Sequence, residues 1–167
     1  MSEASSKILR EGHELFFAKQ PDYLGAAEFF EQVVALRPDW SEGHHWLGLT
    51  YEALGDEDRA AEEWQTAILL DRNDSRPLIA LGALRARQRR FDEAIELLEQ
   101  AIGLKPHYGF ANAKLFLADA FEGARKIELA KQQWREVLEL EPMYPSYDNP
   151  MKKAHQKLRF YGGADKV

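Results

Sequence analysis

Residues 47–67, LGLTYEALGDEDRAAEEWQTA, decide the fold, because their pattern returns thirty-four positions later in residues 81–101, LGALRARQRRFDEAIELLEQA. Leu47-Gly48 opens the first stretch and Leu81-Gly82 opens the second, with alanines at the same offsets after each pair. A unit of this length is a helix-turn-helix whose apolar face is covered by the next unit. The sequence therefore predicts a tandem helical repeat, with its function in a surface rather than in a catalytic pocket.

The same positions recur on either side of these two copies, so the pattern indicates four repeats. One slot holds a small residue in each copy: Gly12, Gly48, Gly82 and Ala118. A second slot holds alanine: Ala26, Ala60, Ala94 and Ala130. A third holds a large apolar residue: Phe30, Trp64, Leu98 and Trp134. A fourth slot closes the copies with Pro38, Arg72, Pro106 and Pro142. We expect the alanines to face the small residues where two helices cross, and the large residues to be buried.

These positions resemble the tetratricopeptide repeat, in which Leu-Gly, an aromatic residue, Ala, an aromatic residue, Ala and Pro recur in that order. The resemblance implies an all-α, right-handed superhelical solenoid of about four repeats in a single domain, residues 1–167. The repeats are expected near 5–38, 39–72, 73–106 and 107–142. A linker, 143–149, would lead to a C-terminal capping helix, 150–161, whose polar side faces solvent.

The helix-stop and helix-start residues give expected bounds for the repeat helices. These bounds are 5–18, 23–36, 41–54, 57–70, 75–88, 91–104, 109–123 and 127–140. Gly55-Asp56 is typical of a helix stop followed by an N-cap, and Asp39 with Glu42 resembles a capping box. Asn73 or Asp74 can cap the next hairpin. Extra residues fall in the loop 19–24 and at 107–110, where either a partner-binding loop or a self-packed loop fits.

Composition narrows the functional classes. The chain has 167 residues, a net charge of −6 and no cysteine, which excludes disulfides, thiolate catalysis and cysteine zinc sites. Residues 150–167 carry five Lys or Arg and one Asp, a net +4, which leaves −10 for the rest. An acidic body argues against a nucleic-acid partner. The amino terminus lacks an apolar signal core and no stretch is long enough to span a bilayer, so we expect a cytoplasmic protein without membrane insertion.

The resemblance also implies where a partner would bind, since the first helix of each hairpin lines a groove in this family. The expected peptide-binding residues are His13, Glu42, His45, Trp46, Leu49, Glu52, Arg76, Ile79, Ala83, Asn112, Leu115, Phe116 and Asp119. Family members that hold a peptide carboxylate use a set of Lys, Arg and Asn, and of the matching positions here only Arg76 is suitable. An apolar helix or extended segment is therefore the favoured ligand. The protein's own terminus or a second copy could fill the groove instead.

Catalytic and metal sites find little support. His44 and His45 are adjacent, so on a helix they point about 100° apart and cannot chelate one ion. No phosphate loop or nucleophile elbow is present, and we expect no cofactor. Four arginines lie close together at the end of a predicted helix: Arg85, Arg87, Arg89 and Arg90. Their positive charges would complement the helix dipole, and docking of an acidic partner is the alternative.

Two functions follow from the sequence. The first is a non-catalytic protein-interaction module, an adaptor, scaffold or co-chaperone-like protein that holds a peptide segment of a partner. The alternative is a self-assembly module that forms homo-oligomers through its groove or its repeat ends. The basic helix 150–161 is expected to cap the array, with recruitment of a partner as the alternative.

Overall fold

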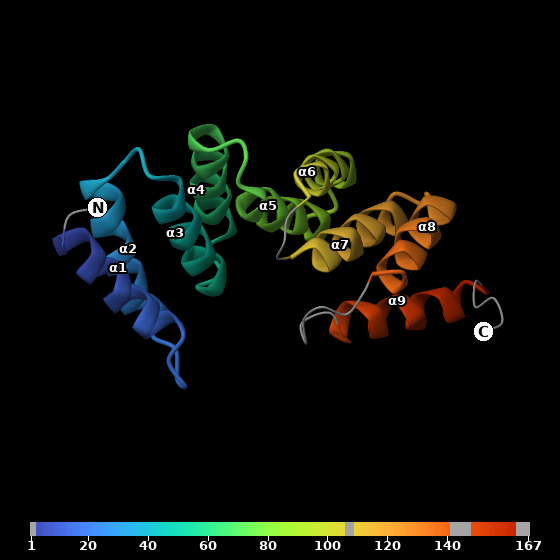
Figure 1. Ribbon diagram of the computed structural model, residues 1–167, viewed down its shortest axis with the longest axis horizontal. Helices are drawn as coiled ribbons and strands as arrows, with labels where there is room; N and C mark the ends of the chain where they lie inside the picture. The colour runs from blue at the N-terminus through green and yellow to red at the C-terminus, as the bar shows by residue number, and fades with distance from the viewer. Residues whose placement is uncertain (1–2, 106–108, 141–147, 163–167) are drawn as a thin grey trace. The chain divides into compact units, whose positions relative to one another are not determined.

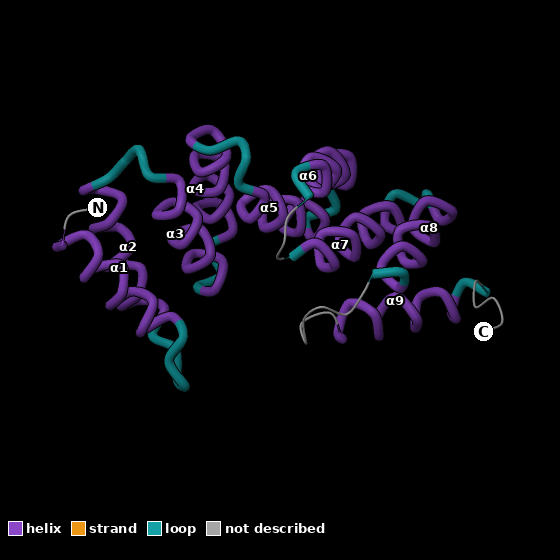
Figure 2. Tube along the Cα trace, in the orientation of Figure 1, coloured by secondary structure: helices purple, strands orange, loops and turns teal. Residues whose placement is uncertain are grey.

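The computed structural model describes residues 3–105, 109–140 and 148–162, which form helices joined by turns, with no strand among them (Figure 2). The helices are α1 Glu3–Phe16, α2 Tyr23–Leu36, α3 Ser41–Ala53, α4 Glu57–Leu70, α5 Ser75–Arg87, α6 Phe91–Gly103, α7 Phe110–Gly123, α8 Ile127–Leu138 and α9 Asp148–Phe160. Each bound lies within two residues of the expected one. The all-α helical-repeat fold predicted from the sequence is confirmed.

The chain forms two compact units, Met1–Ala80 and Leu81–Val167, and the division falls within α5. In the first unit α1 packs on α2, α2 on α3 and α3 on α4 (Figure 1). In the second unit α6 packs on α7, α7 on α8 and α8 on α9, and α9 also contacts α7. Within each unit, these helices therefore pack on their neighbours along the chain, as the repeat pattern predicts.

Within each hairpin a large side chain lies directly against the small residue of the preceding helix. A Cβ atom added at Gly48 would lie 2.5 Å from Nε1 of Trp64, and one added at Gly82 would lie 2.7 Å from Cγ of Leu98. Gly12 stands in the same relation to Phe30. We expected alanines opposite these glycines. The nearest atoms instead belong to the large residue four positions after each alanine, so the glycine makes room for a ring or a branched side chain.

The large residues of this slot are the core of both units. Trp64 and Trp134 are fully buried, which confirms the prediction made for them. Phe30 and Leu98 are buried to the same extent. In the second unit Trp134 shares one apolar cluster with residues of α6, α7 and α9, including Leu158 of α9. The C-terminal helix therefore covers the last hairpin, as expected of a cap.

α7 closes tightly on α6 at its C-terminal end. A Cβ atom on Gly123 would lie 2.2 Å from Cε1 of Phe91, the first residue of α6. No side chain fits at position 123 unless the Phe91 ring moves. This contact joins two successive hairpins inside the second unit.

Three hairpin turns use one left-handed residue at equivalent positions. Gly55, Arg89 and Arg125 have φ angles of 82°, 62° and 61°. In each turn the next amide donates to the carbonyl five residues earlier; Asp56 N, for example, reaches Tyr51 O at 2.9 Å. This is the hydrogen bond of a Schellman motif, whose left-handed residue is usually glycine because it lacks a Cβ.

Helix capping agrees with the sequence at two of three places. Asp56 accepts a hydrogen bond from Arg59 N at 3.1 Å, and Asp74 accepts one from Arg76 N at 2.9 Å. The capping box predicted at Asp39 is wrong, because α3 begins at Ser41 and residue 40 occupies the cap without a side-chain hydrogen bond. Asp39 pairs instead with Arg37 at 3.2 Å.

The first hairpin has the longer turn that the sequence predicted. Residues 17–22 join α1 to α2, whereas 54–56, 88–90 and 124–126 join the later hairpins. The other insertion, the closing prolines Pro106 and Pro142 and linker residues 143–147 lie largely or wholly outside the described residues. Across residues 3–105, 109–140 and 148–162, none of the helices combines the length and the apolar character of a bilayer-spanning segment.

Candidate functional site

The first unit carries a cluster of aromatic rings from α1, from the residue that follows α1, and from α2 and α3. His13 meets the ring of Trp46 edge-on at 4.3 Å between centroids, and Phe17 meets the same ring at 5.6 Å. Phe16 lies 5.8 Å from Trp46, and Phe30 of α2 stacks on it at 6.1 Å. We call these five residues the first-unit aromatic cluster. Two of them, His13 and Trp46, were predicted from the sequence as binding residues.

Phe17 brings this cluster to solvent. Its side chain is 66% exposed although its ring contacts Phe16 and Trp46. An exposed aromatic ring at the edge of a packed aromatic group is typical of a surface that binds another protein. The predicted set omitted Phe17. Its position one helical turn after His13 was the available signal, but the first repeat matches the family pattern poorly.

Three polar atoms in and beside the cluster lack hydrogen bonds to the described residues. Nε1 of Trp46, Nε2 of His13 and Nδ1 of His45 are buried and make no hydrogen bond to the described residues. Burying such an atom costs free energy, on the order of 1–3 kcal/mol. The rings therefore pack as apolar groups, and the packing around Trp46 has to offset that cost.

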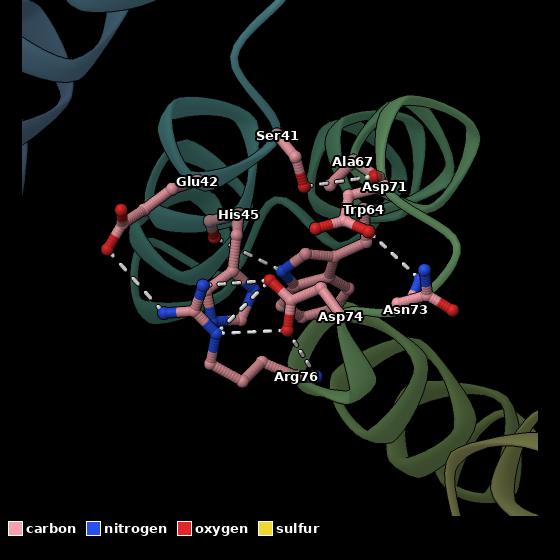
Figure 3. Close-up of polar contacts among 9 residues, drawn as sticks. All are labelled: Ser41, Glu42, His45, Trp64, Ala67, Asp71, Asn73, Asp74 and Arg76. Carbon is pink, nitrogen blue, oxygen red and sulfur yellow. Dashed lines mark hydrogen bonds and ion pairs between the residues drawn. The ribbon is translucent and has the colours of Figure 1, made fainter. Parts of the chain in front are cut away.

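Arg76, at the start of α5, is held by two carboxylates (Figure 3). Its guanidinium contacts Asp74 through Nη2 at 2.8 Å and through Nε at 3.0 Å. Glu42 of α3 lies 3.5 Å from Nη1. Two negative groups thus surround one positive group, which leaves Arg76 poorly placed to capture a peptide carboxylate.

The two histidines beside this ion cluster are neutral at neutral pH. His45 is only 5% exposed, and burial, with a further contribution from Arg76, lowers its pKa to about 4 against the opposing effect of Asp74. Burial also lowers the pKa of His13, and Glu42 opposes that shift. His13 is therefore an uncharged member of the cluster, and His45 is an uncharged, buried neighbour of Trp46.

His44 has a structural role. Its Nδ1 lies 2.7 Å from Oε2 of Glu63, and its Nε2 lies 3.1 Å from the carbonyl oxygen of Pro38. The neighbouring His45 faces Asp74 and Arg76 instead. The two adjacent imidazoles therefore have different surroundings.

The remaining predicted residues of the first unit lie half-buried. Leu49 and Glu52 are on α3 and Ile79 is on α5. They do not take part in the ring contacts that join His13 to Trp46. Their role in binding stays a prediction.

In the second unit the predicted residues divide by burial. Leu115 is 2% exposed and belongs to the core, so it offers no surface to a partner. Ala83 is buried as well. Asn112, Phe116 and Asp119 are partly exposed on α7, and Phe116 packs against the core.

Asp119 lies beside the C-terminal helix. It lines a pocket of about 400 Å³ with Glu122, Lys153, Gln156 and Lys157. Burial raises the pKa of Asp119, although Lys157 opposes the shift. Glu122 accepts hydrogen bonds from Lys157 and, at 2.6 Å, from the hydroxyl of Tyr161. These contacts fix α9 against α7 at a position predicted to bind a partner.

The arginine run is largely engaged within the protein. Arg90 donates to both oxygens of Glu93 at 2.7 Å, and Arg85 is buried and lies 3.6 Å from the same carboxylate. The guanidinium of Arg89 lies 5.9 Å from the centre of the Phe91 ring. The sequence suggested a solvated helix end, but Arg85 is buried and Arg90 lies at the N-cap of α6, so the run spans the turn between α5 and α6.

Two consecutive stretches of the chain, residues 41–74 and 78–111, match models of the tetratricopeptide repeat. The chain is a tetratricopeptide-repeat protein. Tetratricopeptide repeats are in general a protein-interaction fold without catalytic machinery. Comparison with curated proteins gave no match.

Solved structures agree with this fold. The structure of pilF from Pseudomonas aeruginosa is 19% identical in sequence and superposes with a TM-score of 0.77. The alignment covers 99% of this chain and 78% of the pilF chain. MamA of Desulfovibrio magneticus RS-1 is 16% identical with a TM-score of 0.75, covering 99% of each chain. The Sgt2 TPR domain from Aspergillus fumigatus is 24% identical with a TM-score of 0.63, covering 78% and 83%. Because these sequence identities are no higher than 24%, the similarity shows that this chain shares the fold of these proteins and nothing more.

Proposed function

We propose that this tetratricopeptide-repeat protein is a non-catalytic interaction module, an adaptor, scaffold or co-chaperone-like protein that binds a peptide segment of a partner. In the first unit the segment would lie on α1, α3 and the start of α5. The observation that carries the proposal is the exposed ring of Phe17, which extends the packed rings of His13 and Trp46 to solvent.

The chemistry of this surface favours an apolar segment. Phe16, Phe17 and Trp46 supply ring faces and edges, which account for much of the affinity in peptide grooves. Arg76, the cation among the predicted binding residues of the first unit, already contacts Asp74 and Glu42. A free C-terminal carboxylate would have to compete with both, so the proposed ligand is an internal segment.

On the second unit the proposal extends to Asn112, Phe116 and Asp119, the partly exposed predicted residues of α7. Leu115 is left out because it lies in the core. A cytoplasmic location stays a prediction from the sequence, which fractionation of cells that express a tagged chain would test.

Self-assembly is the second candidate, and the charge distribution favours it. Residues 1–80 contain 7 Lys or Arg and 16 Asp or Glu, a net −9, whereas residues 81–167 contain 15 and 12, a net +3. Opposite charges on the two units of one chain attract unlike units of different copies.

A peptide selection tests the first candidate. Segments that bind the full chain would be selected from a random-peptide phage library, and their dissociation constants measured for the wild type and for Phe17→Ala. We expect the variant to bind about tenfold or more weakly, because an aromatic anchor buried by a partner contributes more than about 1 kcal/mol. Leu69→Ala removes an equally exposed apolar side chain of α4 and serves as the control. Equal loss in both variants, or no selected segment, would count against the proposal.

A further inference from the structure

The exposed side of α9 is basic and carries one large aromatic residue. Ala154 and Leu158 are buried against the second unit, while Lys152, His155 and Arg159 point to solvent. Phe160 is 79% exposed, with its ring edge-on to that of Tyr161 at 4.9 Å. The outer side of α9 therefore presents an uncovered aromatic ring close to positively charged side chains.

The first-unit aromatic cluster has the complementary chemistry. Phe17 presents an exposed ring, and the ion cluster beside Trp46 has two carboxylates, Glu42 and Asp74, for one guanidinium. The Glu42 side chain is itself partly exposed. A cation brought to this surface would meet a net negative charge and aromatic faces, and both attract it.

We propose that α9 of one copy docks on the first-unit aromatic cluster of a second copy. Phe160 packs against Phe17 and Trp46, and Lys152 or Arg159 pairs with Glu42. This inference uses the binding surface of the proposed function and names its occupant as another copy of the chain. The net charges of −9 and +3 on the two units favour this orientation over contact between like units.

The contact is heterologous, since it joins two different surfaces. Each copy keeps one free cluster and one free α9 after docking, so copies add in a head-to-tail series that ends only if a ring closes. Mass therefore grows with concentration rather than stopping at a dimer. A contact dominated by charge also weakens with salt.

Sedimentation velocity of the full chain from about 1 µM to about 1 mM tests the proposal. We expect the weight-average mass of the wild type to rise with concentration at low salt, and the association constant to fall about tenfold or more in high salt. This first measurement needs no variant. A wild type that stays monomeric throughout would overturn the inference.

Two variants, each altered on one surface, make the test specific. Variant A carries Phe17→Ala with Glu42→Gln, and variant B carries Lys152→Glu with Arg159→Glu. Circular dichroism would first confirm that both fold. Each alone should remain monomeric. Their mixture should give a dimer and nothing larger, because one intact cluster meets one intact α9.

A matched control, Lys126→Glu with Arg135→Glu, makes the same charge change at exposed positions of α8 and the turn before it. It should still assemble. Loss of assembly in this control, or a mixture of A and B that stays monomeric, would overturn the proposal. If the wild type is monomeric but binds a selected peptide through Phe17, this inference falls and the proposed function stands.

Discussion

The indole Nε1 of Trp64 donates a hydrogen bond to the backbone carbonyl of His45, at 3.3 Å. Trp134 occupies the equivalent position seventy residues later, but its Nε1 is buried without a hydrogen bond to the described residues. The two hairpins differ at the residue beneath the ring, which is Gly48 in one and Ala118 in the other. The methyl group of an alanine needs the space into which the Trp64 ring fits.

Gly48→Ala should therefore destabilise the first unit. The new methyl would lie 2.5 Å from Nε1 of Trp64, so the ring must move and its hydrogen bond is lost. Overpacking of this kind costs roughly 1–3 kcal/mol, against a gain of about 1 kcal/mol in helix propensity. We expect a net loss of about 1–2 kcal/mol in urea unfolding followed by circular dichroism. Gly103→Ala, where open space surrounds the added Cβ, should be neutral or stabilising.

The hydrogen bond itself can be isolated by comparing the two tryptophans. Trp64→Phe removes ring volume and the bond to His45, whereas Trp134→Phe removes ring volume and a buried N–H that makes no hydrogen bond to the described residues. We expect Trp64→Phe to lower the free energy of unfolding by about 1 kcal/mol more than Trp134→Phe. Equal losses in the two variants would mean that the bond adds no net stability.

Arg89 should be replaceable by glycine with a gain in stability. Its φ of 62° is left-handed, and the equivalent residue of an earlier hairpin is Gly55. Relief of this backbone strain is worth up to about 1 kcal/mol after the greater freedom of glycine in the unfolded chain is subtracted. Thermal unfolding would measure the gain. Arg135→Gly, in α8, should lower stability by about 1 kcal/mol, and a similar loss in Arg89→Gly would contradict the prediction.

Stability should fall with acid through His45. Its pKa is about 4 in the folded protein and about 6.5 in the unfolded chain. As the pH falls, the unfolded state therefore takes up a proton before the folded state does. The folded protein keeps its full stability with respect to His45 above pH 6.5 and loses free energy of unfolding as the pH falls toward 4. At pH 5 the loss relative to pH 7.5 is about 2 kcal/mol.

The variant His45→Leu should show a flatter dependence of unfolding free energy on pH over this window. His155→Gln changes an exposed histidine and should keep the wild-type slope. The charges of Arg76, Asp74 and Glu42 lie close to His45, and salt screens charges. The unfolding measurements therefore need a constant ionic strength at every pH. An unchanged slope in His45→Leu would show that the residual dependence comes from other groups, such as His13.

The sequence predicted the helices well because the repeat fixes their spacing independently of tertiary detail. Glycine at 48 and tryptophan at 64 recur in register with Gly82 and Leu98, so helix positions and buried residues follow from the pattern. The start of α3 did not follow from it. Ser41 donates a hydrogen bond to the carbonyl of Ala67, which ties the first residue of α3 to α4, and Asp39 is left outside the helix.

The candidate site was predictable only in part. Trp46 and His13 occupy positions that the family pattern assigns to a first helix, and the structure brings them together. Leu115 occupies such a position too, yet packing in the second unit buries it, and no helical periodicity distinguishes the two cases. Phe17 lies where the first repeat departs from the pattern, so its contact with Trp46 emerges only from the packing.

The fit of the Phe91 ring against Gly123 limits how the protein could be lengthened by engineering. A copied hairpin inserted after α6 would have to end its own first helix with glycine, or the ring at position 91 would collide with the new side chain. Equivalent residues of the earlier hairpins, such as Ala53, carry a side chain there. A duplication of the second hairpin would therefore not fit at this joint, whereas a duplication of the fourth would.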